Sequence, residues 1–99
     1  MVEIIWLEEA RLDLKDIFDY ISRDSKRYAQ RQVDKIFERA QLLLTHINAG
    51  KIVEEIGQSE IRELIEGNYR IVYRIIDKEK VHILLVHHGA RDLTKRLGS

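Results

Sequence analysis

The stretches of sequence that decide the fold are YRIVYRII at residues 69–76 and VHILLVHH at residues 81–88. In the first stretch, aromatic and aliphatic side chains alternate with a set that contains Arg70 and Arg74, as expected of a strand. The second stretch is apolar on both faces, which is typical of a central strand. Only a charged turn at residues 77–80 separates the two, so we expect them to pair antiparallel.

The segment before this pair predicts further strands. Residues 61–65 form a short run that ends in the turn signal Glu66-Gly67-Asn68. Residues 51–56 are a weaker strand candidate, followed by a break at residues 57–59. Strands joined in series by short turns form an antiparallel sheet.

The first half of the chain predicts one strand and two helices. Residues 2–6 contain β-branched side chains, which favours a strand. Residues 7–21 and residues 29–47 carry apolar side chains at spacings of three and four, which line one face of a helix. The segments at residues 22–25 and 48–50 interrupt and end these helices.

Together these elements predict an α+β fold in a single domain, residues 1–99. An antiparallel helix hairpin would pack on a mainly antiparallel sheet of three to four strands, with a short C-terminal tail at residues 91–97. The absence of cysteine excludes disulfides and cysteine-ligated zinc. Apolar runs such as residues 83–86 are too short to span a membrane, and the N-terminus lacks the pattern of a secretory signal. We therefore expect a cytoplasmic protein without a membrane partner.

The charges of the chain are balanced overall. There are 17 Lys and Arg residues against 17 Asp and Glu residues, and neither half of the chain is basic. An electrostatic contact with nucleic acid would therefore have to come from local clustering of cations.

The four histidines do not predict a metal site. His87 and His88 are neighbours on a strand and point to opposite faces. His82 and His88 are expected to share a face, but they lie about 20 Å apart along the strand. The motif H-E-x-x-H is absent. We expect no metal and no cofactor.

Arginines are the candidate functional residues. Arg70 and Arg74 are expected on one side of a strand, about 13 Å apart, and Arg62 on the preceding strand could join them. Guanidinium groups on a sheet face suit a phosphate or carboxylate ligand. The alternative is that they are exposed positions paired with nearby acids, namely Glu63, Glu66 and Asp77. The candidate target-binding residues are Arg62, Arg70, Arg74, His88 and Arg91.

Four stretches of the chain resemble toxins of the RelE/ParE superfamily from bacterial type II toxin–antitoxin modules. These are Trp6 with ARLDLKDIFDYI at residues 10–21, IREL at residues 61–64, YRIVYRI at residues 69–75 and VHHGARDL at residues 86–93. Because the four stretches have the order and spacing of these toxins, the resemblance extends over nearly the whole chain. It implies the same fold that the periodicity predicts.

The resemblance is stronger to the ParE-like branch, whose members inhibit DNA gyrase and trap it on cleaved DNA. RelE-like members instead cleave messenger RNA in the ribosome and are usually strongly basic. Here the nuclease pattern of lysines is replaced by Ile61, Arg62 and Glu63, and the position of its last catalytic arginine falls at Gly89. The tail after Arg91 has no Tyr or His. The resemblance thus implies a gyrase inhibitor without enzymatic activity.

Two alternatives stay open. A ribosome-dependent endoribonuclease would use Arg70, His88 and Arg91 as its catalytic residues, with the ribosome and messenger RNA as partners. Arginine is poorly suited to proton transfer, however, and only one of the two adjacent histidines can face Arg70. The other alternative is an inactive protein of the toxin fold that only binds a partner.

The resemblance also implies partners. A cognate antitoxin would fold onto the helix hairpin and the sheet edge and neutralise the toxin, in a plasmid-stabilising module for example. The toxin would form a homodimer or a toxin–antitoxin heterotetramer, and the tail to Leu97 is a further candidate contact for the target.

Overall fold

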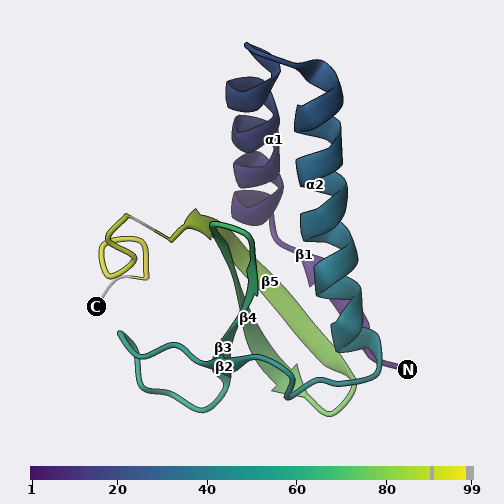
Figure 1. Ribbon diagram of the computed structural model, residues 1–99. Coiled ribbons are helices and arrows are strands. Elements are labelled where there is room, and N and C mark those ends of the chain that lie inside the picture. Colours follow the sequence, from purple (N-terminus) through teal and green to yellow (C-terminus); the bar gives the residue numbers. More distant parts are fainter. Residues whose placement is uncertain (90, 98–99) are drawn as a thin grey trace.

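The computed structural model describes residues 1–89 and 91–97 (Figure 1). Ala90, which belongs to one of the quoted stretches, lies outside the described residues, as do Gly98 and Ser99. The elements in chain order are β1 (Glu3–Trp6), α1 (Glu8–Ser22), α2 (Lys26–Ala40), the 3-10 helix η1 (Gln41–Leu44), β2 (Lys51–Ile52), β3 (Ile61–Glu66), β4 (Tyr69–Asp77) and β5 (Lys80–His88).

Charged and capping side chains account for where the two helices of the hairpin begin. Glu8 and Glu9 occupy the first turn of α1, where negative charge is favourable. Ser25 caps α2, since its Oγ accepts the N–H of Tyr28 at 3.1 Å. The second helix was predicted to reach residue 47, but the α-helix ends at Ala40 and η1 continues the chain. This tighter turn keeps Leu43 fully buried, so the apolar stripe continues although the helix type changes.

The predicted α+β fold is confirmed, but the sheet has five strands, in the order β1-β5-β4-β3-β2, rather than the predicted three to four, because β1 pairs with β5 and joins it. The N-terminal strand β1 joins the sheet parallel to β5, and the other neighbours pair antiparallel. The weak strand candidate at residues 51–56 forms only the two-residue β2. Val53, just beyond it, is fully buried instead.

Both faces of the sheet are covered. The helices cover one face, where Ile36, Ile71 and Tyr73 belong to the larger core cluster. On the other face, Val53 and Leu93 pack on residues of β3, β4 and β5. The segment between β2 and β3 and the C-terminal turn therefore form a second, partial layer (Figure 1). The arginine-bearing face of β4 is thus partly enclosed rather than open.

A bulge in β5 changes which residues share a face. Val72 lies opposite Leu85 and Tyr73 opposite Ile83, so Leu84 is an extra residue. His82 consequently lies opposite Arg74, whereas His88 lies opposite Tyr69. The expectation that His82 and His88 share a face is therefore wrong.

The described part of the chain offers neither a metal cluster nor a membrane span. Residues 1–89 and 91–97 contain no group of three or more His, Cys, Asp or Glu side chains arranged to hold a metal ion. Within the same residues no helix is long and apolar enough to cross a membrane.

Candidate functional site

Arg70 lies on the sheet face opposite the helices and is bound by two glutamates. Its Nε donates to Glu63 Oε1 at 3.0 Å, and its Nη2 donates to Glu63 Oε2. The same guanidinium donates to both carboxylate oxygens of Glu55, at 2.8 and 2.9 Å. These contacts form the clasp, which we define as Arg70, Glu55 and Glu63. It ties the segment after β2 to strands β3 and β4.

The clasp leaves Arg70 with little capacity for another ligand. A guanidinium has five N–H donors, and four hydrogen bonds already use all three of its nitrogens. The hydrogen bonds to Glu55 and Glu63 raise the pKa of Arg70 above its usual range. Two carboxylates around one cation leave the clasp negative, so it is not a phosphate site. The expected pairing of Arg70 with Glu63 is present, and Glu55 was missed.

The clasp predicts a loss of stability in acid. The hydrogen bond from Arg70 lowers the pKa of Glu55 from 4.5 to about 2. Because the folded-state pKa is depressed, the interaction stabilises the fold at neutral pH, and this stabilisation is lost as the pH falls from about 4.5 through about 2. Urea unfolding at a series of pH values should show this loss. In Glu55→Gln it should be smaller, and an equal loss in both proteins would contradict the role of Glu55.

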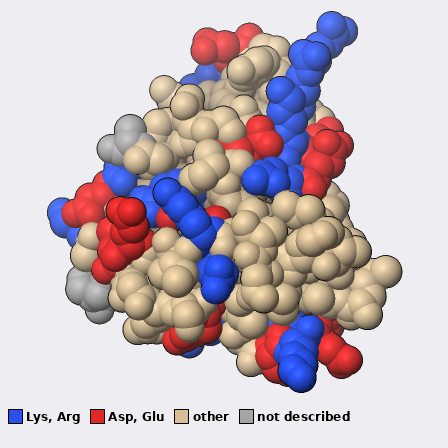
Figure 2. All heavy atoms as spheres, turned by 60° about the horizontal axis from the view of Figure 1, so that its bottom comes forward, with Lys and Arg blue, Asp and Glu red and all other residues tan. Residues whose placement is uncertain are grey.

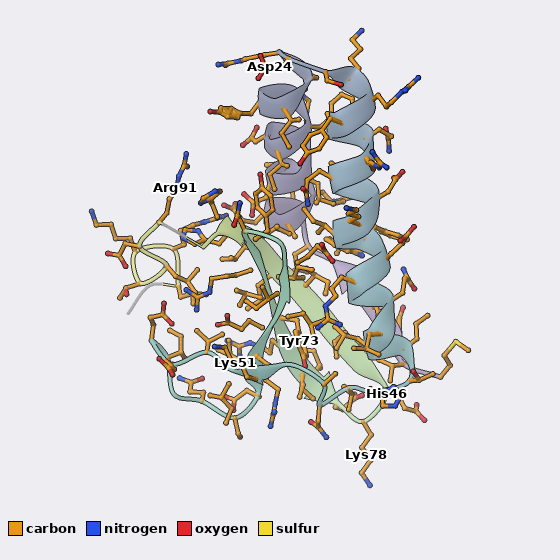
Figure 3. The ribbon with its side chains drawn as sticks, viewed as in Figure 1. Asp24, His46, Lys51, Tyr73, Lys78 and Arg91 are labelled. Carbon is orange, nitrogen blue, oxygen red and sulfur yellow. The ribbon has the colours of Figure 1, made fainter. Side chains whose placement is uncertain are left out.

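An acidic hollow opens beside the clasp at the end of the sheet. It is lined by the clasp together with Lys51, Glu54 and His88, among others. Figure 3 labels Lys51 at the lower part of this region. Three glutamates line it against one lysine and one arginine, so the hollow suits a cation better than an anion.

Arg62 does not join Arg70, which corrects the expectation from the sequence. Its Cα lies opposite that of Tyr73, whose side chain packs under the helices. Directly paired residues project to the same face. The guanidinium of Arg62 accordingly donates to the carbonyl oxygens of Ser59 and Gly50, both at 3.0 Å. It ties together the segments that precede β2 and β3.

Of the remaining predicted residues, His88 and Arg91 line a common hollow, whereas Arg74 does not belong to it. Arg74 is exposed on β4, and its Cα lies opposite those of Ile61 and His82. His88 is exposed and its ring meets that of Tyr69 edge-on, with centroids 5.5 Å apart. Arg91 is exposed just beyond β5, where Figure 3 shows it pointing away from the sheet. The structure does not bring Arg74 and Arg91 into the acidic hollow with Arg70 and His88.

His87, rather than His88, shares a face with Arg70. The two residues lie opposite each other in the β4–β5 ladder, and His87 is only 4% exposed. Its Nε2 lies 2.9 Å from the carbonyl oxygen of Arg91, so Nε2 carries the proton. His87 is thus engaged in holding the start of the tail. It is poorly placed to serve as a general base.

Arg96 is a residue whose position the sequence did not reveal. Its Nη2 donates to both carboxylate oxygens of Asp13, at 2.9 and 2.8 Å, and to Glu9 at 3.0 Å. Asp13 also accepts the N–H of Val86 at 2.8 Å. These contacts fasten the C-terminal tail to α1, 83 positions away. No local sequence signal marks an ion pair of such separation.

A second hollow, the tail groove, lies between α1 and the tail. Its apolar wall includes Ile17, Tyr20 and Tyr69, and its charged lining holds residues of both signs, namely Glu9, Asp13, Asp16, Arg91, Asp92, Lys95 and Arg96. Tyr20 is 66% exposed, which is high for an aromatic side chain. An apolar, aromatic wall beside charged groups is typical of a surface that binds another protein.

Comparisons with known proteins agree with this geometry. The family model described as ParE toxin of type II toxin–antitoxin system, parDE, matches residues 4–93. A protein called Toxin RelE2 from Caulobacter vibrioides is 28% identical over 91 residues, which is 92% of this chain and 99% of the relative.

Two solved structures are also similar. The chromosomal ParDE system from P. aeruginosa has a TM-score of 0.72 at 23% identity, covering 89% of this chain and 96% of that one. The toxin–antitoxin complex RelBE2 from Mycobacterium tuberculosis has a TM-score of 0.60 at 26% identity, covering 92% and 97%. The first likeness concerns the fold alone, whereas the family model spans nearly the whole chain. The chain belongs to the ParE toxin family of type II toxin–antitoxin systems.

Proposed function

We propose that this toxin acts by inhibiting DNA gyrase and that a cognate antitoxin neutralises it. The observation that carries the proposal is the clasp, because Arg70 is the residue that matches a nuclease catalytic position in the sequence. With two carboxylates bound to it, Arg70 is not available to stabilise a phosphate that gains charge.

The groups around Arg70 are also poorly suited to proton transfer. Cleaving RNA through its 2′-hydroxyl needs a base and an acid, and each contributes roughly 10²–10⁴-fold. His87 is buried, and its Nε2 donates to the carbonyl oxygen of Arg91. The side chain of Arg91 lines the tail groove rather than the acidic hollow that contains Arg70. A protein that inhibits its target by binding alone needs neither a catalytic acid nor a catalytic base.

The tail groove is the proposed docking site for part of the antitoxin. The similar solved structures are described as a ParDE toxin–antitoxin system and as a toxin–antitoxin complex. The exposed ring of Tyr20 and the neighbouring Tyr69 would provide aromatic anchors. Arg91 and Lys95 would pair with acidic residues of the incoming segment, and Asp16 and Asp92 would pair with basic ones.

The test is a supercoiling assay with purified gyrase and purified toxin. We expect inhibition and accumulation of cleaved DNA. The double variant Arg74→Ala, Arg91→Ala should inhibit at least roughly 100-fold less well, because each removed cation contributes a charged hydrogen bond worth about 1.5–3 kcal/mol. Both residues are exposed, so the fold should persist. The control is Lys78→Ala, which removes an exposed cation from the β4–β5 turn.

The second candidate function is that of a ribosome-dependent endoribonuclease. It is favoured by the likeness to proteins named RelE2 and RelBE2. Toeprinting on translating ribosomes separates the two. Cuts within the A-site codon that disappear in Arg70→Gln, combined with unimpaired gyrase, would overturn the proposal.

A further inference from the structure

The charges of the chain are balanced overall, but the two helices carry opposite net charges. α1 carries five Asp and Glu residues against two Lys and Arg residues, a net charge of −3. α2 carries five Lys and Arg residues against two Asp and Glu residues, a net charge of +3. The hairpin therefore has one acidic and one basic helix side by side (Figure 1).

The cations of α2 form a regular row along its surface. The row, which we call the basic stripe, consists of Arg27, Arg31, Lys35 and Arg39, each four residues after the previous one. Residues at this spacing are neighbours on a helix surface. With a rise of 1.5 Å per residue, the stripe is about 18 Å long. Figure 2 shows a continuous column of Lys and Arg side chains at the upper right, on the side of the molecule where α2 lies.

The basic stripe is unfavourable for the helix that carries it. Its three like-charged pairs at i,i+4 each destabilise a helix by about 0.2–0.5 kcal/mol. Lys26 and Arg27 also place positive charge in the first turn, where no acidic residue is present and the helix dipole is already positive. Local rules are commonly broken in this way at functional sites.

The stripe is also not neutralised within the described part of the chain. Arg70 and Arg96 each bind two carboxylates. Among residues 1–89 and 91–97, by contrast, no carboxylate forms an ion pair with any member of the stripe. The nearby acid Asp34 instead accepts a hydrogen bond from Gln30 at 2.8 Å. Arg39 donates only to the carbonyl oxygen of Ile65, at 3.0 Å.

We infer that the basic stripe binds the phosphate backbone of duplex DNA. One strand of DNA presents a phosphate every 3.4 Å along its axis, so a stripe of about 18 Å spans about five phosphates. Four cations over that length suit such a repeating polyanion. The acidic face of α1 would be repelled, and this would orient the hairpin with α2 towards the DNA. The choice of DNA over another polyanion rests on the proposed function, in which the target holds DNA.

The experiment measures binding of the purified toxin to a 20-base-pair DNA duplex at several salt concentrations, without gyrase. Four phosphate contacts predict that log K falls with log[salt] with a slope of about −3.6, or about 150-fold between 50 and 200 mM salt. In the variant Arg27→Gln, Arg31→Gln, Lys35→Gln the slope should be about −0.9, with a loss of only about 3-fold over that range. Arg39 is kept because it bonds to β3.

The matched control removes three exposed cations from other parts of the surface, in Arg11→Gln, Lys51→Gln, Lys78→Gln. It changes the net charge equally and should keep the wild-type slope. Equal weakening in both triple variants would overturn the inference, because net charge alone would then explain binding. Tighter stripe-dependent binding of poly-glutamate or of an RNA hairpin than of the DNA duplex would also overturn it. Since gyrase is absent from this assay, failure of gyrase inhibition would leave its result unchanged.

Discussion

Replacing Arg70 by alanine is expected to lower the free energy of unfolding by about 3–5 kcal/mol, because Glu63 would be left as an uncompensated buried charge. The side chain of Glu63 is 2% exposed and that of Arg70 is 16% exposed. For a domain of this size the change corresponds to a fall in melting temperature on the order of 20 °C. Thermal unfolding at neutral pH measures it directly.

A double variant tests whether the loss of stability comes from the unpaired buried charge or from lost packing. In Arg70→Met, Glu63→Leu both charges are removed and apolar volume is restored, so most of the lost stability should return. Arg74→Ala on the same strand should change stability by less than about 0.5 kcal/mol, since Arg74 is exposed. If the double variant were as unstable as Arg70→Ala, the clasp would not be the reason for the loss.

The second large effect is expected for Gly50→Ala. A Cβ at this position would lie 2.6 Å from the carbonyl oxygen of Glu63 and 2.7 Å from Cε1 of Tyr73. The backbone N–H of Gly50 also donates to the buried hydroxyl of Tyr73 at 3.0 Å, and any shift would weaken that bond. We expect a loss on the order of 3 kcal/mol, measured by urea unfolding.

Gly57→Ala is the control for this substitution. Gly57 has a positive φ of 71°, but a methyl group added there would meet no heavy atom within 4 Å apart from its own chain neighbours. Its replacement should therefore cost only the strain of the left-handed backbone, about 1 kcal/mol. Equal losses in the two glycine variants would show that crowding around Gly50 is not the cause.

Periodicity in the sequence was sufficient to predict most of the fold. Apolar spacing placed the helix hairpin, and the apolar run at residues 81–88 identified an interior strand, β5, which pairs with both β1 and β4. The candidate site was harder to predict from the sequence. A single extra residue at Leu84 leaves no trace in an apolar run, yet it reverses the faces of the residues beyond it.

The partners of Arg70 illustrate why the rest could not be predicted. Glu63 was foreseeable because it lies on the neighbouring strand, whereas Glu55 comes from an irregular segment whose path the sequence does not specify. The target-binding roles of Arg74, His88 and Arg91 stay predictions. The helix charges, by contrast, were readable from the sequence, but a sum over each half of the chain concealed them.

The parallel pairing of β1 with β5 has a consequence for how the toxin folds. Glu3 lies opposite Lys80, so this contact joins positions 77 residues apart. Contacts of such separation carry a large loop-closure entropy and slow the folding reaction. β1 stays unpaired until β5 has been synthesised, and until then the nascent toxin lacks its complete sheet.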